Sequence, residues 1–127
     1  MSFLPEDDRR YLAEKGTAYE EREADGQRGV ILPNFRVPGR HLDAPTVKLL
    51  ILIPPGYADV PPDMFYTDPW LRLAANSNYP RAANVAQAFG GINWQRWSRH
   101  NPEWRPGVDG IWTMLKRVEH ALEVAAA

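Results

Sequence analysis

Few side chains in this chain can act as covalent nucleophiles. None of its 127 residues is cysteine, so a nucleophile has to be an oxygen or a nitrogen atom. One of the serines, Ser98, stands two residues before a histidine, His100. Serine needs an adjacent base to become a strong nucleophile, and imidazole is the commonest one. Side chains two apart share a face in an extended segment but diverge in a helix, so the pair predicts a loop or strand at 98–100.

Both residues also have ordinary structural explanations. A loop serine most often caps a backbone group, and a histidine in a tryptophan-rich segment can simply hold that segment by a hydrogen bond. The sequence around Ser98 lacks the Gly-x-Ser-x-Gly pattern of a hydrolase nucleophile elbow. His41 and His120 lie far from His100 and show no ligand spacing with it. We therefore expect no metal site and no cofactor.

Tryptophans and arginines are mixed between residues 94 and 112, and such a mixture can stack on single-stranded nucleic acid. The net charge of the chain is −1, however, and the mixture is not repeated. A nucleic-acid-binding domain usually has a clear basic excess. The pattern favours core packing with arginines over indole rings, so nucleic acid is not an expected partner.

The overall composition is that of a globular domain, with 44% hydrophobic and 24% charged residues. The length suits one compact unit, so we expect residues 1–127 to form a single domain. No apolar run approaches the roughly 20 residues of a membrane helix, and the N-terminus lacks the pattern of a secretory signal. These features predict a cytoplasmic protein that has no membrane partner.

The N-terminal half of the sequence predicts a helix followed by strands. Pro5 and the three acidic residues after it suit the start of a helix, and Lys15-Gly16 suits its end. Apolar residues between 17 and 37 are divided by the turn dipeptide Asp25-Gly26, which predicts a hairpin. Residues Val47–Ile53 are apolar at both alternating positions except at Lys48. This run predicts a central strand that is covered on both faces.

The C-terminal half predicts irregular structure and then a helix. Prolines at positions 54, 55, 61 and 62 predict an ordered loop, and a short strand is expected at 64–67. We expect irregular structure over 68–84 and a helix over Val85–Phe89. Residues spaced three and four apart predict the apolar face of a final helix: Val108, Ile111, Met114, Leu115, Val118 and Leu122. This order predicts an α+β domain with an antiparallel meander of about four strands.

Several sequence blocks resemble the ubiquitin-conjugating enzymes. The run from Ile53 to Thr67 resembles the proline-rich flap of that superfamily, with Ala58 where a proline is usual, and Trp104-Arg105-Pro106 resembles its Trp-x-Pro segment. A bacterial branch, prokaryotic family E, is more similar. It shares Pro-Pro-Gly-Tyr (54–57), Asp-Met-Phe (63–65), Trp-x-x-Trp-Ser-Arg-His (94–100) and Trp-Arg-Pro-Gly-Val-Asp-Gly (104–110). The resemblance is strongest over 45–122, and the joint spacing is more specific than any single block.

The resemblance implies a UBC-like fold with an N-terminal helix, a meander, a proline-rich flap and a C-terminal helix. It also implies a transferase of the ubiquitin-conjugating type. The expected partners are a ubiquitin-like protein and an adenylating activating enzyme, in a bacterial pathway of the kind associated with antiphage defence.

Site residues follow from the same resemblance. Ser98 falls near the position of the family's cysteine, which implies that it carries the acyl group as an oxyester. His100 is the candidate base, while Arg99 and Arg96 are candidates for supplying positive charge. Asp109 is a candidate for orienting or deprotonating the incoming amine. The family's His-Pro-Asn triplet has no counterpart here, so its asparagine's oxyanion role is not carried over.

Two other interpretations fit the same residues. The chain can be a catalytically inactive module that docks a ubiquitin-like protein or an activating enzyme. Alternatively, Ser98 can stand where a cysteine was removed by mutation. An adduct that resists thiol but is cleaved by hydroxide distinguishes an oxyester carrier from a docking module.

Overall fold

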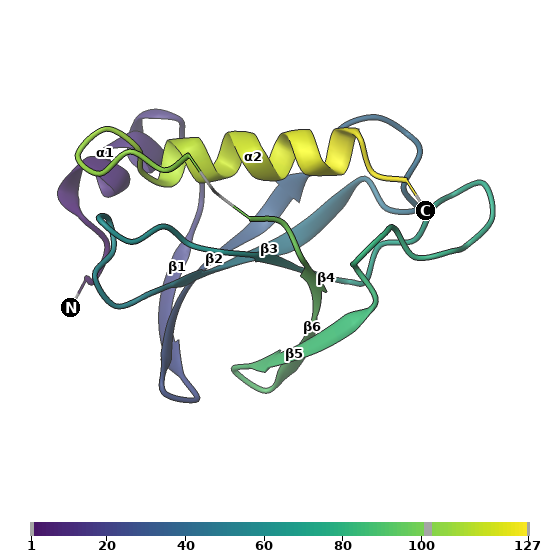
Figure 1. The fold of residues 1–127 in the computed structure, drawn as a ribbon, viewed down its shortest axis with the longest axis horizontal. Coiled ribbons are helices and arrows are strands. Elements are labelled where there is room, and N and C mark those ends of the chain that lie inside the picture. The colour runs from purple at the N-terminus through teal and green to yellow at the C-terminus, as the bar shows by residue number, and fades with distance from the viewer. Residues whose placement is uncertain (1, 101–102, 127) are drawn as a thin grey trace.

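The computed structural model describes residues 2–100 and 103–126, which adopt an α+β arrangement. The elements are α1 (Glu6–Glu14), β1 (Glu20–Ala24), β2 (Gln27–Arg36), β3 (Thr46–Ile53), β4 (Phe65–Asp68), β5 (Val85–Phe89), β6 (Ile92–Trp97) and α2 (Ile111–Glu123). Within the described residues, the strands form one antiparallel sheet in the order β1-β2-β3-β4-β6-β5. Both helices lie on one face of the sheet, and the sheet curls away from them (Figure 1).

The expectations for the N-terminal half are confirmed. Helix α1 follows Pro5 and has three acidic residues in its first turn. The β1–β2 hairpin turns at Asp25 and Gly26, whose φ angles of 53° and 74° lie in the left-handed region that suits this dipeptide. Strand β3 lies inside the sheet between β2 and β4, as its apolar sequence predicted.

Strand β3 contributes side chains to a hydrophobic cluster on each face of the sheet. Leu49 and Ile51 belong to the larger cluster, which includes buried residues of α1 and α2. Leu50 belongs to a smaller cluster on the opposite face, together with Phe89 and Trp94. Because residues alternate across a strand, a run that is apolar at every position is buried only when both faces are covered.

Two sequence expectations are wrong in the middle of the chain. The sheet has six strands in the described residues instead of about four. The segment Val85–Phe89 is not a helix; it forms strand β5, which pairs with β6 through a turn at Gly90 and Gly91. Both glycines have positive φ angles, 60° and 81°, which a tight hairpin turn requires here. A short apolar run cannot distinguish helix from strand, and burial of Phe89 in the smaller cluster decides for the strand.

The C-terminal helix is confirmed but begins later than its apolar pattern suggested. Helix α2 starts at Ile111, so Val108 precedes it and is 54% exposed. The remaining pattern is correct, since Ile111, Met114, Val118 and Leu122 are buried. Neither helix in the described residues has the length and apolarity needed to cross a membrane.

Candidate functional site

Ser98 lies directly after β6, outside helix and strand, as the sequence predicted for residues 98–100. Its backbone N–H donates to the carbonyl oxygen of Ala82 at 3.1 Å, which fixes it against the 69–84 segment. The preceding residue, Trp97, is fully buried, stacks on Phe65 with ring centroids 5.4 Å apart, and donates to Thr67 at 3.0 Å. Ser98 itself is half-buried. Its position is therefore set by its backbone and by the indole before it.

His100 contacts an acid that the sequence did not single out. Its Nδ1 lies 2.9 Å from a carboxylate oxygen of Asp63, and both side chains are largely exposed. An ionised carboxylate only accepts hydrogen bonds, so the Nδ1–H of the imidazole is the donor. In the tautomer that carries its proton on Nδ1, Nε2 is free of a proton and can accept one. No hydrogen bond joins Ser98 to His100 within the described residues.

The two candidate arginines, Arg96 and Arg99, differ in their contacts. Arg99 donates to the Ser98 carbonyl oxygen at 3.0 Å and lies over the Trp97 ring at 5.5 Å. Partial burial, with the nearby Arg81 guanidinium, lowers the pKa of Arg99. The Nε of Arg96 is buried and has no hydrogen-bond partner among the described residues. Arg99 therefore contacts the backbone of Ser98, whereas the Nε of Arg96 is enclosed by protein.

Asp109 is a structural clamp in this arrangement. Its side chain is only 4% exposed and accepts hydrogen bonds from the backbone N–H of Arg105 at 2.8 Å, its guanidinium at 3.0 Å and Thr113 at 3.0 Å. The Arg105 hydrogen bonds lower the pKa of Asp109 to about 2. Both oxygens have donors, so this carboxylate fastens the turn before α2.

The proline-rich loop between β3 and β4 is fastened to both sides of the candidate site. Trp104 donates from Nε1 to the Ala58 carbonyl oxygen at 2.8 Å, and His100 contacts Asp63 at the other end of the loop. Tyr57 packs against Trp104 with ring centroids 6.2 Å apart. The proline-rich loop and the segment that follows β6 therefore lie next to each other.

A buried acid joins this loop to both helices. Asp8 of α1 is 1% exposed and accepts hydrogen bonds from the Tyr57 hydroxyl at 2.6 Å and from the N–H of Ile111 at 3.3 Å. Burial raises the pKa of Asp8, although the two hydrogen bonds oppose this effect. Burial and the Asp8 carboxylate also raise the pKa of Tyr57. The sequence assigned this pair no role: Tyr57 appeared only within the Pro-Pro-Gly-Tyr block, and an acid such as Asp8 in the first turn of a helix gives no sign of burial.

We expect Asp8→Ala to lower the free energy of unfolding by about 2–4 kcal/mol, because it leaves the Tyr57 hydroxyl and the Ile111 N–H without an acceptor. Urea unfolding measures the loss. The matched control is Asp7→Ala, which removes an exposed acid from the same turn and should cost less than about 1 kcal/mol.

The difference in unfolding free energy between wild type and Asp8→Ala should change with pH in one direction. A raised pKa means that the folded state binds the Asp8 proton more tightly than the unfolded state does. This stabilisation is complete below the unfolded pKa and is lost as pH rises through the folded pKa. The difference between wild type and Asp8→Ala should therefore shrink as pH rises from acid toward neutral. A difference that grows with pH would contradict the burial of this carboxyl group.

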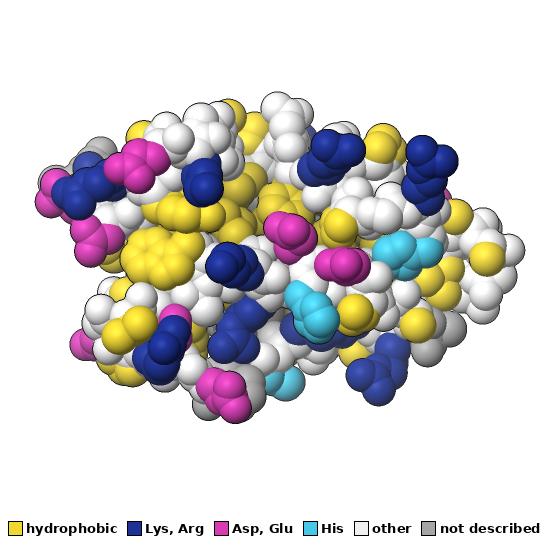
Figure 2. All heavy atoms as spheres, turned by 90° about the horizontal axis from the view of Figure 1, so that it is seen from above, with side chains coloured by type: hydrophobic (Ala, Val, Ile, Leu, Met, Phe, Trp, Pro, Cys, Tyr) yellow, Lys and Arg dark blue, Asp and Glu magenta, His cyan; other side chains and the backbone are white. Residues whose placement is uncertain are grey.

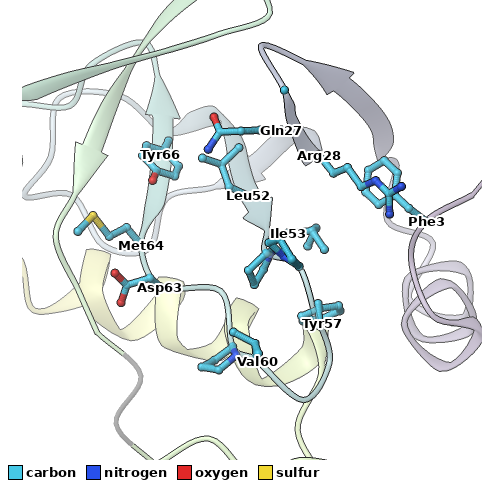
Figure 3. Close-up of a pocket in the computed structure, with 15 residues that line it drawn as sticks. Phe3, Gln27, Arg28, Leu52, Ile53, Tyr57, Val60, Asp63, Met64 and Tyr66 are labelled. Atoms are coloured by element: carbon cyan, nitrogen blue, oxygen red, sulfur yellow. The ribbon is translucent and has the colours of Figure 1, made fainter.

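A hollow of about 750 Å³ opens beside the proline-rich loop (Figure 3). Asp63, which holds His100, is one of its lining residues, so the hollow reaches the candidate site. Most of its lining is apolar and comes from the N-terminal segment, the end of β3, the proline-rich loop and β4: Phe3, Leu52, Ile53, Pro54, Pro55, Tyr57, Val60, Pro61, Met64 and Tyr66. Figure 3 shows Asp63 and Met64 at one side of this hollow and Phe3 and Arg28 at the other.

The sequence blocks contained Asp63 within Asp-Met-Phe but gave it no role. The contact between His100 and Asp63 joins residues 37 positions apart, and no local sequence pattern predicts such a pair. Among residues 2–100 and 103–126, no group of three His, Asp or Glu side chains is arranged to hold a metal ion.

Comparison with known proteins gives one match. The family model described as prokaryotic E2 family E matches residues 4–125, which is nearly the whole chain. Searches of curated proteins and of solved structures gave no match. The coverage includes both helices, all the strands described above and the segment that carries Ser98. The chain therefore belongs to prokaryotic E2 family E, a family of E2-like proteins related to ubiquitin-type conjugation.

Proposed function

We propose that this chain is an acyl carrier in a ubiquitin-like conjugation pathway. Ser98 accepts the activated C-terminus of a ubiquitin-like protein from an activating enzyme, holds it as an oxyester and passes it to an amine. The observation that carries the proposal is the 2.9 Å contact between His100 Nδ1 and Asp63, two residues from the serine. It places an imidazole in contact with a carboxylate two residues from Ser98, at one end of the proline-rich loop.

The first step forms the oxyester. The Ser98 hydroxyl oxygen attacks the carbonyl carbon of the donor thioester, a C–O bond forms and the C–S bond breaks. The hydroxyl proton moves to His100 Nε2, which then gives it to the departing thiolate. Asp63 contributes by orienting the imidazole through its contact with Nδ1.

The second step transfers the acyl group. The nitrogen of a neutral amine attacks the ester carbonyl carbon, a C–N bond forms, and the C–O bond to Ser98 breaks. One proton of the amine returns to the serine oxygen. An oxyester is less reactive toward amines than a thioester, so the reaction depends strongly on positioning and on cations near the developing oxyanion. Arg99 is the candidate cation, and Asp109 contributes by holding the turn at 105–109 in place.

The deciding experiment uses the wild-type chain, its activating enzyme, ATP and the processed ubiquitin-like protein. We expect a covalent adduct that resists thiol and is cleaved by hydroxide. Absence of any adduct, under conditions in which the activating enzyme itself becomes charged, would overturn the carrier proposal. Peptide mapping of the adduct by mass spectrometry then identifies the modified residue.

A second candidate function is a docking module without catalysis. The observation that favours it is the environment of Ser98, which is half-buried and whose hydroxyl has no hydrogen-bonded base among the described residues. Under this alternative, the chain binds the ubiquitin-like protein or the activating enzyme tightly and never becomes charged. The adduct experiment, combined with a binding measurement, separates the two candidates.

We expect His100→Ala to slow adduct formation by about 10²-fold to 10⁴-fold, the usual contribution of a general base. Asp63→Asn should slow it as well but by less, because the imidazole remains and only its carboxylate partner is lost. Single-turnover kinetics measure both rates. The control is His120→Ala, which removes another exposed histidine on α2. Equal rates of adduct formation for wild type and His100→Ala would show that His100 is not the general base.

A further inference from the structure

Strand β5 presents an uncharged free edge. It ends the strand order of the sheet, so one of its edges has no neighbouring strand in the described part of the chain (Figure 1). Its sequence, Val-Ala-Gln-Ala-Phe, contains no charge, no proline and no glycine, and only Phe89 is buried. Such an edge is a template for pairing with another chain, and most proteins protect their edges against it.

The opposite edge of the sheet is protected by charge. Strand β1, at the other end of the order, has the sequence Glu-Glu-Arg-Glu-Ala. Its Arg22 forms an ion pair with Glu20. Its Glu23 forms another with Arg28 of β2. Charged side chains of both signs are also spread over the helix-bearing side of the molecule (Figure 2). Of the two sheet edges, only that of β5 lacks charged residues.

The turn of the β5–β6 hairpin decides which backbone groups of β5 face outward. Its two-residue loop makes Phe89 and Ile92 the flanking pair, and the flanking pair of such a hairpin exchanges hydrogen bonds. Hydrogen-bonded pairs alternate along an antiparallel ladder, so the backbone of Gln87 also faces β6. The N–H and C=O groups of Ala86 and Ala88 therefore point away from β6. In agreement, the Gln87 side chain donates to the Ala88 carbonyl oxygen at 3.3 Å.

This outward edge is complementary to a second copy of itself. The sequence has an alanine on each side of Gln87 and a large apolar residue at each end. When two copies of β5 pair antiparallel about a two-fold axis at Gln87, Ala86 lies opposite Ala88 of the second copy. Each of the two alanine pairs can then exchange both N–H···O=C bonds, so every outward backbone group of these alanines gains a partner. Val85 lies opposite Phe89 of the second copy.

Charge favours this occupant over the other possible edge pairings. Pairing of β1 with a second β1 would bring the glutamates of two copies onto adjacent strands, and like charges there are destabilising. Pairing of β1 with β5 would set charged side chains beside uncharged ones and remove part of their hydration. Pairing of β5 with β5 opposes no charges. It also uses the free β5 edge of both copies, so the assembly closes at two chains.

We propose that this chain forms a two-fold dimer in which the β5 edges of two copies pair antiparallel, with Gln87 at the axis. Ser98 follows the end of β6 that lies beside Val85. The antiparallel arrangement places the two Val85 residues at opposite ends of the junction, so the two candidate sites lie apart from each other. The dimer does not depend on the proposed carrier function.

Position 87 provides the test, because it is the residue of β5 that faces its own counterpart. Sedimentation equilibrium should show the wild-type average mass rising with concentration from 14.5 kDa toward twice that value. Gln87→Lys and Gln87→Glu each place like charges on directly opposed residues. We expect each variant alone to raise the dimer dissociation constant at least about tenfold. An equimolar mixture of the two should restore dimerisation, because lysine then faces glutamate.

The matched controls are Gln27→Lys and Gln27→Glu, since Gln27 is an exposed glutamine outside β5. Both should dimerise like wild type, and urea unfolding checks that every variant is folded. A wild-type mass that stays at one chain up to about 1 mM would overturn the proposal. So would unchanged dimerisation of the single variants, or a mixture that fails to restore it. A mass that grows beyond two chains would also overturn it, because a two-fold contact is closed.

Hydrogen exchange of the wild-type chain locates the junction without any substitution. The amides of Ala86 and Ala88 should exchange more slowly at high than at low protein concentration, because each becomes hydrogen-bonded in the dimer. A dimer in which these two amides exchange at the same rate at both concentrations would place the contact elsewhere and overturn the proposal.

Discussion

We expect the Ser98→Ala variant to form no hydroxide-labile adduct, while its free energy of unfolding stays within about 1 kcal/mol of wild type. The adduct disappears because alanine offers no oxygen to bond to the acyl carbon. Stability is maintained because the segment is fixed through groups that the substitution keeps, the Ser98 N–H on Ala82 and the buried Trp97. Denaturing gel electrophoresis after incubation with the charged activating enzyme measures the adduct, and urea unfolding measures stability.

Replacement by cysteine provides the complementary test. Ser98→Cys should become charged faster than wild type, because a thiolate is the stronger nucleophile, and its adduct should become sensitive to thiol. Ser77→Ala is the matched control, since Ser77 is an exposed serine in the 69–84 segment, outside residues 98–100. An adduct that persists in Ser98→Ala with unchanged hydroxide sensitivity would assign the acyl group to another residue. A thiol-resistant adduct on Ser98→Cys would lead to the same conclusion.

The sequence predicted the parts of the fold that depend on local chemistry. Pro5 and its acidic neighbours define a helix start, Asp25-Gly26 defines a turn, and the apolar run of β3 requires cover on both faces. The β5–β6 hairpin could not be read in the same way, because Val85–Phe89 is too short to show a period and four of its five residues remain partly or fully exposed. Pairing with β6 decides its conformation, and this pairing is a tertiary effect.

At the candidate site, too, the sequence predicted what depends on neighbouring residues but not the contacts between residues far apart in the chain. Residue types and spacing predicted Ser98 and His100, and a non-helical segment there is confirmed. The contact that orients His100 was not predicted, because Asp63 reaches it across 37 positions. The hydrogen bond from Tyr57 of the proline-rich loop to Asp8 spans 49 positions and was not predicted either. Asp109 has contacts that the sequence did not indicate, since its carboxylate accepts hydrogen bonds from Arg105 and Thr113.

Gln95 is the polar residue on which the site segment depends most. It lies in β6 between the two buried tryptophans and is fully buried. Its amide oxygen accepts from the Thr67 hydroxyl at 2.8 Å and the Leu71 N–H at 2.7 Å, and its amide nitrogen donates to the carbonyl oxygens of Leu71 at 2.9 Å and Ala83 at 2.8 Å. An amide side chain has two acceptor sites and two donors, so every one is used. The residue thereby ties β6 to β4 and to both ends of the 69–84 segment.

We expect Gln95→Leu to lower the free energy of unfolding by about 3–6 kcal/mol, because it leaves buried backbone groups of Leu71 and Ala83 unpaired at about 1–3 kcal/mol each. That loss is a large part of the roughly 5–15 kcal/mol that keeps a domain folded. Urea unfolding measures it, and faster hydrogen exchange at the Leu71 amide would locate it. Gln87→Leu is the matched control, since its amide makes one hydrogen bond at 3.3 Å on β5 and should cost less than about 1 kcal/mol.

The same variant tests whether the hydrogen bonds of Gln95 help to position Ser98. Ala82, which accepts the hydrogen bond from the Ser98 N–H, directly precedes Ala83, so loosening the carbonyl partner of Gln95 also loosens the support of Ser98. A carrier that depends on positioning should then become charged more slowly at temperatures where Gln95→Leu is still folded. If that variant loses stability but keeps its charging rate, Ser98 is positioned by Trp97 alone. If it loses neither, the amide network does not support this part of the fold.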